Sequence, residues 1–324
     1  MNSPIIIAEF CQNHNGNFDL LAKIVEAAKN SGATYGKIQT IFAENLSFRP
    51  QFERGLVTNG QTKCIKRPYQ MEYDRLKGLE LSFEEMQRFC DLCQSVDLKP
   101  MTTCFAREYI PQLSEVGFAA IKVASYDCAS FQMLRELKES FSKVIVSTGA
   151  TFDNEIEYAA RALEGIPFAF LHCVTIYPTP LDQMHLARME YLRNFTAEVG
   201  FSDHSLVSRD GLIASKAALA LGADIVERHF TVLDAQDTKD GPVSINPNQL
   251  KELTDFASTP IEQRLEFMNQ MFPEWKILIG QKQRLLTDTE LLNRDYYRGR
   301  FANKRLGTIK YKSMIDNWEE IPLK

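Results

Sequence analysis

Two histidines stand where two strand-like segments end. His204 follows the segment Ala197–Phe201, and His229 ends the segment Asp224–His229. If these segments are adjacent parallel strands, which lie about 4.8 Å apart, both imidazoles can reach one ion. Neutral imidazoles suit divalent ions such as Mn2+, Co2+ and Zn2+, and two protein ligands leave positions open for water and substrate. The spacing therefore indicates a catalytic metal site, although a pair of hydrogen-bonded core histidines would be spaced in the same way.

Two lysines lie inside other strand-like segments. Lys37 and Gln39 are two residues apart, so their side chains should point to the same side of a strand. A buried lysine is costly unless it meets an anion or pairs with a carboxylate. Lys37 and Lys122 therefore indicate a pocket for phosphate and carboxylate groups, and the alternative is a salt bridge to Glu9 or Asp203 that only fills the interior. The hydroxyls that could complete the pocket belong to Thr103, Ser125, Ser147 and Ser202.

A regular alternation of β-branched runs and amphipathic stretches carries these residues. The runs that we interpret as strands are Ile5–Glu9, Gly36–Thr40, Lys99–Thr103, Ala120–Ala124, Lys143–Ser147, Phe168–Cys173, Ala197–Phe201 and Asp224–His229. The stretches between them space apolar residues three and four apart, as helices do, and include Asp19–Ser31, Phe83–Val96, Tyr109–Val116, Phe131–Glu139, Asp153–Leu163 and Arg209–Leu221. Eight such strands predict an α/β fold, a (β/α)8 TIM barrel, whose chemistry sits at the carboxyl ends of the strands.

The alternation also sets the domain boundaries. It continues to about residue 258, so we assign residues 1–258 to the barrel and residues 259–324 to a short helical and irregular C-terminal extension. Between residues 40 and 79 the spacing stretches, and the segment is rich in Arg, Gln and Tyr. We interpret this segment as a long loop over the mouth of the barrel.

Composition limits the possible partners. The 324-residue chain is 44% apolar and 24% charged, which is typical of a soluble globular protein. A net charge of −5 gives no basic surface for nucleic acid, and no apolar run approaches the roughly 18 residues of a membrane span. Seven scattered cysteines, an odd number, are typical of free thiols in the cytoplasm. We therefore expect a cytoplasmic protein with neither nucleic acid nor membrane as a partner.

Short motifs follow one another along the chain in a fixed order. They are Ile7-Ala-Glu-Phe-Cys-Gln-Asn-His-Asn-Gly16, Lys37-Ile-Gln-Thr40, Lys122-Val-Ala-Ser125, Ser147-Thr-Gly149, Leu171-His-Cys173, Tyr177-Pro-Thr-Pro180, Ser202-Asp-His204 and Glu227-Arg-His-Phe-Thr231. Their order and spacing over about residues 4–250 resemble the sialic acid synthase family, which includes N-acetylneuraminate, legionaminate and pseudaminate synthases. One such motif would be weak, whereas the ordered set is highly specific.

The resemblance implies a metal-dependent enzyme that condenses phosphoenolpyruvate with an N-acylated amino-sugar aldehyde and releases phosphate. The product is a sialic-acid-like nonulosonic acid. The implied metal is Mn2+, with Co2+, Mg2+ or Zn2+ as alternatives, held by His204 and His229. The residues implied for phosphoenolpyruvate are Lys37, Thr103, Lys122, Ser125, Ser147 and Ser202, and those implied for the sugar are Gln39, Asp127 and Tyr177. Glu9 is implied as an acid/base group, and Asp203 of the Ser202-Asp-His204 motif joins Glu9 and the two lysines as a catalytic residue.

Three departures from the family pattern bear on specificity and assembly. Thr175 stands where the family commonly has Asn, and its hydroxyl can still bind a phosphate oxygen. Val243 stands where the family has a sugar-binding Asp, so Asp240 or Asp237 could substitute, and the amino sugar is not fixed by the sequence.

The third departure is at the C-terminus. About 40 residues follow Gly280, too few for the complete antifreeze-like domain that, in the family, swaps onto a partner and sends it an arginine. A homodimer is still the expected assembly, and Arg298 or Arg300 could replace that arginine.

Two other functions fit the same residues. A Schiff-base aldolase or lyase would use Lys122 or Lys37 as its nucleophilic amine, and it would be indifferent to chelators. A catalytically incomplete sugar-phosphate binding protein would bind phosphoenolpyruvate without releasing phosphate.

Overall fold

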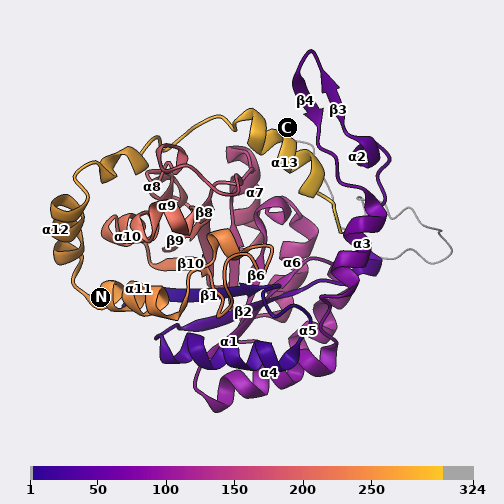
Figure 1. Ribbon diagram of the computed structural model, residues 1–324, viewed down its shortest axis with the longest axis horizontal. Coiled ribbons are helices and arrows are strands. Elements are labelled where there is room, and N and C mark those ends of the chain that lie inside the picture. The colour runs from indigo at the N-terminus through magenta and orange to yellow at the C-terminus, as the bar shows by residue number, and fades with distance from the viewer. Residues whose placement is uncertain (1–2, 302–324) are drawn as a thin grey trace.

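A closed parallel barrel forms the centre of the computed structural model, which describes residues 3–301 (Figure 1). Its strands pair in the order β1-β10-β9-β8-β7-β6-β5-β2, and β2 closes the ring against β1. The strands are β1 Ile5–Cys11, β2 Tyr35–Thr40, β5 Lys99–Cys104, β6 Ala120–Val123, β7 Val144–Ser147, β8 Phe168–Cys173, β9 Glu198–Asp203 and β10 Ile225–His229. The predicted (β/α)8 barrel is confirmed, and the predicted strand ends are displaced by no more than a few residues.

The inside of the barrel is divided into an apolar layer and a polar layer. The apolar layer consists of Ile7, Tyr35, Met101, Ala120, Ile145, Ala169, Leu171 and Ile225. Two residues further along most of these strands, the side chains that point inward are polar, because side chains two apart lie on the same face. Glu9 is paired in register with Lys37, Thr103 with Lys122, and Glu227 with Ser202. The apolar layer therefore closes the barrel below a polar layer at the carboxyl ends of the strands.

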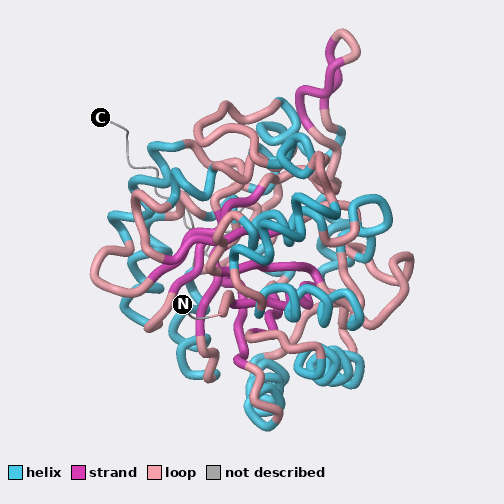
Figure 2. Tube along the Cα trace, turned by 90° about the vertical axis from the view of Figure 1, so that its left-hand side faces the viewer, coloured by secondary structure: helices cyan, strands magenta, loops and turns pink. Residues whose placement is uncertain are grey.

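Amphipathic helices pack around the outside of the barrel, as Figure 2 shows. They are α1 Phe18–Asn30, α4 Phe83–Ser95, α5 Ile110–Val116, α6 Phe131–Ser140, α7 Asp153–Ala162, α8 Arg188–Leu192, α9 Val207–Asp210, α10 Ile213–Ala220 and α11 Pro247–Ser258. The prediction of one helix over Arg209–Leu221 is wrong in one respect. Gly211, with a φ of 54°, separates α9 from α10, because that left-handed conformation ends a helix.

The segment after β2 is more ordered than the predicted loop. It contains the 3-10 turn η1 Ala43–Asn45, the helices α2 Gln51–Arg54 and α3 Tyr69–Lys77, and a hairpin of β3 Leu56–Thr58 and β4 Gln61–Cys64. The hairpin projects from the body of the molecule in both views (Figures 1 and 2). The part of the segment after the hairpin lies at the barrel mouth, as predicted, since its Arg67 and Arg75 line the cavity described below.

The described part of the C-terminal extension follows the barrel surface. Helix α12 Ile261–Met271 packs against α10, and the guanidinium of Arg264 donates to the carbonyl of Leu219 at 2.9 Å. The turn η6 Trp275–Leu278 follows, and then α13 Asp288–Tyr297, whose Arg294 donates to the carboxylate of Glu155 at 2.6 Å. The remaining residues of the predicted extension, 302–324, lie outside the described part. No helix within residues 3–301 is long and apolar enough to cross a membrane.

Candidate active site

A cavity of about 400 Å3 opens at the carboxyl ends of the barrel strands. Twelve of the residues predicted for the site line it, and they come from every barrel strand or the turn that follows it. They are Glu9, Lys37, Gln39, Thr103, Lys122, Ser125, Ser147, Tyr177, Ser202, His204, His229 and Asp240. The strand alternation therefore brings together residues that are up to 231 positions apart in the sequence.

Two lysines and two glutamates form the bottom of this cavity, which we call the floor: Glu9, Lys37, Lys122 and Glu227. The ammonium of Lys37 forms an ion pair with Glu9 and lies 3.7 Å from Glu227, and that of Lys122 lies 3.9 Å from Glu227. All four side chains are buried. The predicted alternative of a lumen salt bridge is thus correct for Glu9, although not for Asp203.

Hydroxyl groups form hydrogen bonds with the charged side chains of the floor. Lys37 donates to Thr103 at 3.0 Å, and Lys122 donates to Ser147 at 2.6 Å. Ser202 donates to Glu227 at 3.0 Å. Each lysine therefore has a carboxylate on one side and a hydroxyl on the other, and an anion that enters the cavity would find ammonium and hydroxyl donors already in place.

Burial shifts the protonation of the floor. It lowers the pKa of Lys37 to about 7, with Lys122 acting in the same direction and Glu227 against it. Burial also acts to raise the pKa of Glu227, but the charges of Lys122 and Lys37 and the hydrogen bond from Ser202 together hold it below its ordinary value. The Glu227 carboxylate therefore stays ionised, while the amine of Lys37 titrates near pH 7.

The two predicted metal ligands lie side by side at the cavity wall. The ring centroids of His204 and His229 are 5.2 Å apart, and the Tyr177 ring packs edge-on against His204 at 4.4 Å. Burial lowers the pKa of both imidazoles, so both are neutral. The Nδ1 atom of His229 is buried and has no hydrogen-bond partner among the described residues. Neutral, adjacent imidazoles with an unpartnered nitrogen fit a divalent metal.

Asp203 does not reach the cavity, contrary to the prediction. It lies one residue after Ser202 on β9 and therefore points to the outer side of the barrel. There its carboxylate pairs with Arg228 at 2.7 Å and accepts from Ser215 at 2.5 Å, and both Asp203 and Arg228 are fully buried. A contact with substrate would require the strand to turn over, so the structure supports a structural role for Asp203.

Asp127 and Thr175 lie behind the cavity wall. Asp127 ends the turn η3 Ser125–Asp127, where burial raises the pKa of its carboxyl to about 7 against the charges of Arg298 and Arg300. The Thr175 carbonyl accepts from Asn293 of α13 at 2.8 Å, so the residue supports the extension. Neither residue lines the cavity, although the residues two positions away, Ser125 and Tyr177, do.

Four cations surround the opening of the cavity and form what we call the rim: Arg67, Arg75, Lys239 and Arg300. Arg75 pairs with Glu72 at 2.8 Å, and Arg300 pairs with the same carboxylate. Lys239 has no ion-pair partner in residues 3–301. Of the two arginines considered for this position, Arg300 reaches the cavity, whereas Arg298 pairs with Glu155 at 3.2 Å.

Sequence reasoning missed several lining residues. Glu227 could have been found, because it lies two residues before His229 on the same strand and must share its face. The rim carries no comparable signal. Arg67, Arg75 and Lys239 stand on irregular connections or on α3, where no periodicity shows which way a side chain points.

Fold and cavity together define a (β/α)8 barrel with a charged site at the strand ends, the place where barrel enzymes carry their chemistry. Comparison with known proteins shows to which family of barrel proteins the chain belongs. Residues 24–266 match the NeuB family, and the chain belongs to that family.

Several relatives of the chain are named as synthases. The N,N'-diacetyllegionaminic acid synthase of Campylobacter jejuni is 31% identical over 78% of this chain and 75% of its own length. The pseudaminic acid synthase of the same organism is 28% identical over 77% of this chain and 71% of its own. A crystal structure of N-acetylneuraminic acid (sialic acid) synthetase from Leptospira borgpetersenii, in complex with citrate, superposes with a TM-score of 0.69 at 25% identity and covers 91% of each chain. These likenesses support a nonulosonic acid synthase.

Proposed function

We propose that this protein is a cytoplasmic, homodimeric synthase that condenses phosphoenolpyruvate with an N-acylated amino-sugar aldehyde and releases phosphate. One observation carries the proposal. A single cavity has two buried lysines with paired hydroxyls at its floor and two neutral histidines on its wall. The lysines suit the phosphate and carboxylate of phosphoenolpyruvate, and the histidines suit a divalent metal next to the aldehyde.

Each group has a defined role in the proposed reaction. Lys122 with Ser147, and Lys37 with Thr103, hold the anionic groups of phosphoenolpyruvate. A divalent ion bound by His204 and His229, Mn2+ in the first instance, would supply a Lewis acid for the aldehyde oxygen. C3 of phosphoenolpyruvate forms the new bond to the aldehyde carbon, water adds to C2, and phosphate leaves with its bridging oxygen. Glu9, which lies between Lys37 and the histidine strand, accepts the proton of the attacking water.

Phosphate release tests the proposal directly. The purified protein is incubated with phosphoenolpyruvate and Mn2+ across N-acetylmannosamine, its 6-phosphate and the diacetamido-hexoses that correspond to legionaminic and pseudaminic acids. Release that depends on a sugar and disappears with a chelator is the expected result. Phosphoenolpyruvate binding without release for any sugar would instead favour the catalytically incomplete binding protein.

A second function, the Schiff-base aldolase, is favoured by one observation. The pKa of Lys37 is lowered to about 7, so a fraction of its amine is neutral and nucleophilic at physiological pH. Borohydride treatment in the presence of a keto-acid substrate would trap the adduct on Lys37, and mass spectrometry would locate it. The synthase predicts no trapped adduct and sensitivity to chelators.

A further inference from the structure

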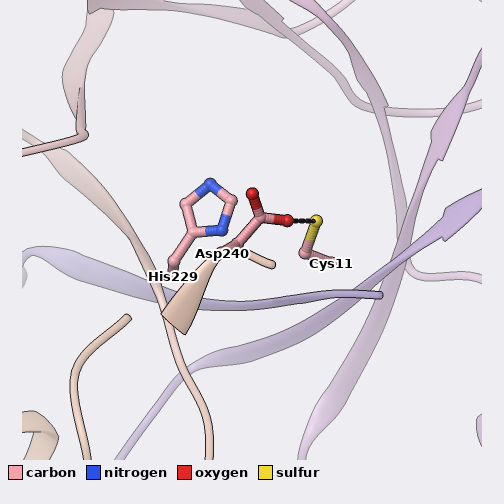
Figure 3. Close-up of side chains that lie close together, drawn as sticks. All are labelled: Cys11, His229 and Asp240. Atoms are coloured by element: carbon pink, nitrogen blue, oxygen red, sulfur yellow. Dashed lines mark hydrogen bonds between the residues drawn. The ribbon is translucent and has the colours of Figure 1, made fainter. Parts of the chain in front are cut away.

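Three potential ligand groups meet at one side of the cavity, as Figure 3 shows. The sulfur of Cys11, a ring nitrogen of His229 and a carboxylate oxygen of Asp240 all lie within 4.8 Å of one another. The thiol of Cys11 donates to Asp240 at 2.9 Å, and the His229 ring faces the same carboxylate (Figure 3). Cys11 and His229 are buried, and Asp240 is half-buried.

The backbone holds Cys11 and Asp240 at this point. The pairing of β1 with β2 is irregular between Glu9 and Cys11, and Cys11 has a φ of 50°. Its N–H donates to the Glu9 carboxylate at 2.6 Å. Cys11 lies two positions after the inward-facing Glu9, so its side chain has the same strand parity, and it lines the cavity beside Glu9.

The loop that carries Asp240 is tied to the turn after β1. Ser244 donates to the Asp240 carbonyl at 2.7 Å, and Asn13 donates to Ser244 at 3.1 Å. A Cβ on Gly241 would lie 2.1 Å from the carbonyl oxygen of Ala235, so only glycine permits this path. The hydrogen bonds of Ser244 and Asn13 therefore hold the loop so that the Asp240 carboxylate lies next to Cys11.

A second, independent observation points to a ligand. The Nδ1 atom of His229 is buried and has no hydrogen-bond partner in the described part of the chain. A buried polar atom left without a partner costs about 1–3 kcal/mol. A metal ion at Nδ1 would satisfy this atom, and the cysteine and aspartate stand on the side toward which the ring faces.

We propose that Cys11 and Asp240 are further ligands of the divalent ion assigned above to His204 and His229, and that the thiolate makes this site favour Zn2+ or Co2+ over Mg2+. Ligand atoms around such an ion stand roughly 3.5 Å apart, and the three atoms here lie within 4.8 Å of one another before any ion binds. Cys11 binds as a thiolate and releases its proton to solvent. This inference rests on the proposed function, because it adds two ligands to the same ion. A fifth coordination position would remain for substrate or water from the cavity.

Titration of the metal-free protein with Co2+ alone tests this site. We expect a thiolate-to-cobalt charge-transfer band in the near ultraviolet with one equivalent bound. Cys11→Ser should abolish the band and weaken binding roughly 10- to 100-fold, and Asp240→Asn should weaken binding while the band persists. Cys90→Ser is the matched control, because Cys90 is a buried thiol on α4 away from the cavity and should leave both unchanged.

X-ray absorption on the wild-type protein loaded with Co2+ or Zn2+ gives a result that does not depend on any variant folding. A sulfur neighbour at about 2.3 Å is expected. Nitrogen and oxygen neighbours alone, or no charge-transfer band at saturating Co2+, would overturn the proposal. Phosphate release measured on the same preparation separates the two ideas: sulfur ligation without release rejects the synthase and keeps the site, and release without sulfur ligation does the opposite.

Discussion

The floor and the rim of the cavity are both charged, but they are built in different ways. The floor residues Glu9, Lys37, Lys122 and Glu227 stand on barrel strands, are buried and balance one another in charge. The rim residues stand on connections, α3 and the C-terminal extension. Two of the four cations, Arg75 and Arg300, pair with one neighbouring carboxylate, Glu72, and Asp240 is the acid that lines the cavity on this side. Cations therefore exceed acids at the rim, among the described residues.

This difference assigns different tasks to the two regions. Groups fixed on strands in a dry cavity can stabilise charge that develops during a reaction, because they need not reorganise. Cations around an opening attract an anionic substrate and raise its rate of association, an effect that salt screens. We expect floor substitutions to lower kcat and rim substitutions to raise KM.

The largest effect is expected at Lys122. Lys122→Met removes one of the two ammonium groups of the floor and leaves Glu227 with Lys37 alone. Sugar-dependent phosphate release should fall about 100- to 1,000-fold in kcat, the usual loss when one preorganised charge donor is removed.

Lys143→Met is the matched control for this substitution. Lys143 precedes β7 at the opposite end of the barrel and pairs with Glu198 at 2.5 Å. Its removal should leave kcat unchanged. Equal losses in the two variants would show that the effect at Lys122 arises from general destabilisation, which thermal unfolding of both proteins would detect.

A smaller effect is expected at the rim. Arg300→Ala removes one cation from the opening, while Glu72 keeps Arg75 as its partner. A charge-assisted hydrogen bond contributes about 1.5–3 kcal/mol, so KM for phosphoenolpyruvate or for a phosphorylated sugar should rise roughly 10- to 100-fold with a much smaller change in kcat.

Ionic strength sharpens this test. Added salt should raise KM less in Arg300→Ala than in the wild type, since part of the screened attraction is gone. Arg193→Ala, which removes a cation paired with Asp224 at 2.9 Å away from the cavity, serves as the control. A fall in kcat as large as that of Lys122→Met would contradict the division between floor and rim.

The floor and rim should also differ in pH dependence. Burial lowers the pKa of Lys37 to about 7, so the floor contains a group that titrates in the neutral range. The Lys37 cation is lost as pH rises through 7, so kcat/KM for phosphoenolpyruvate should fall above that pH, by up to about tenfold per unit. Lys37→Arg should flatten this limb. The Schiff-base function predicts the opposite sign, because its nucleophile is the neutral amine.

The same shift has a consequence for stability. The folded protein binds fewer protons at Lys37 than the unfolded chain does between its lowered pKa of about 7 and its ordinary value of 10.5. The free energy of unfolding contributed by this group therefore rises with pH across that window. In the Lys37→Met variant this contribution should be absent from denaturant unfolding measured between pH 7 and pH 9.

The sequence predicts the floor of the cavity better than its rim. Lys37, Gln39 and Ser147 were predicted because strand periodicity fixes which side chains face inward, and an ordered set of motifs reinforced them. Asp203 was misplaced for the same physical reason. It belongs to a motif with Ser202 and His204, but a strand turns adjacent residues to opposite faces, and a motif does not show that parity.

The rim could not be predicted in this way. Arg75 stands on α3 and Arg300 follows α13, and both line the cavity. No local sequence pattern predicts these two positions, since each depends on how a segment outside the barrel strands packs against the barrel. Cys11, by contrast, could have been found in the same way as Glu227, because it lies two residues after the inward-facing Glu9.

The smallest effect on activity is expected from Asp203→Asn, and its neighbour on β9 provides the comparison. Removing the charge of Asp203 leaves Arg228 fully buried without its carboxylate partner, a change that usually costs about 3–5 kcal/mol of stability. The kcat of the folded protein should be unchanged, because the carboxylate lies outside the cavity.

Ser202→Ala should instead lower activity with little loss of stability. Ser202 faces the floor and donates to Glu227 at 3.0 Å. Thermal unfolding and phosphate release, measured on both variants, would separate the two faces of one strand, and loss of kcat in folded Asp203→Asn would return Asp203 to the catalytic group.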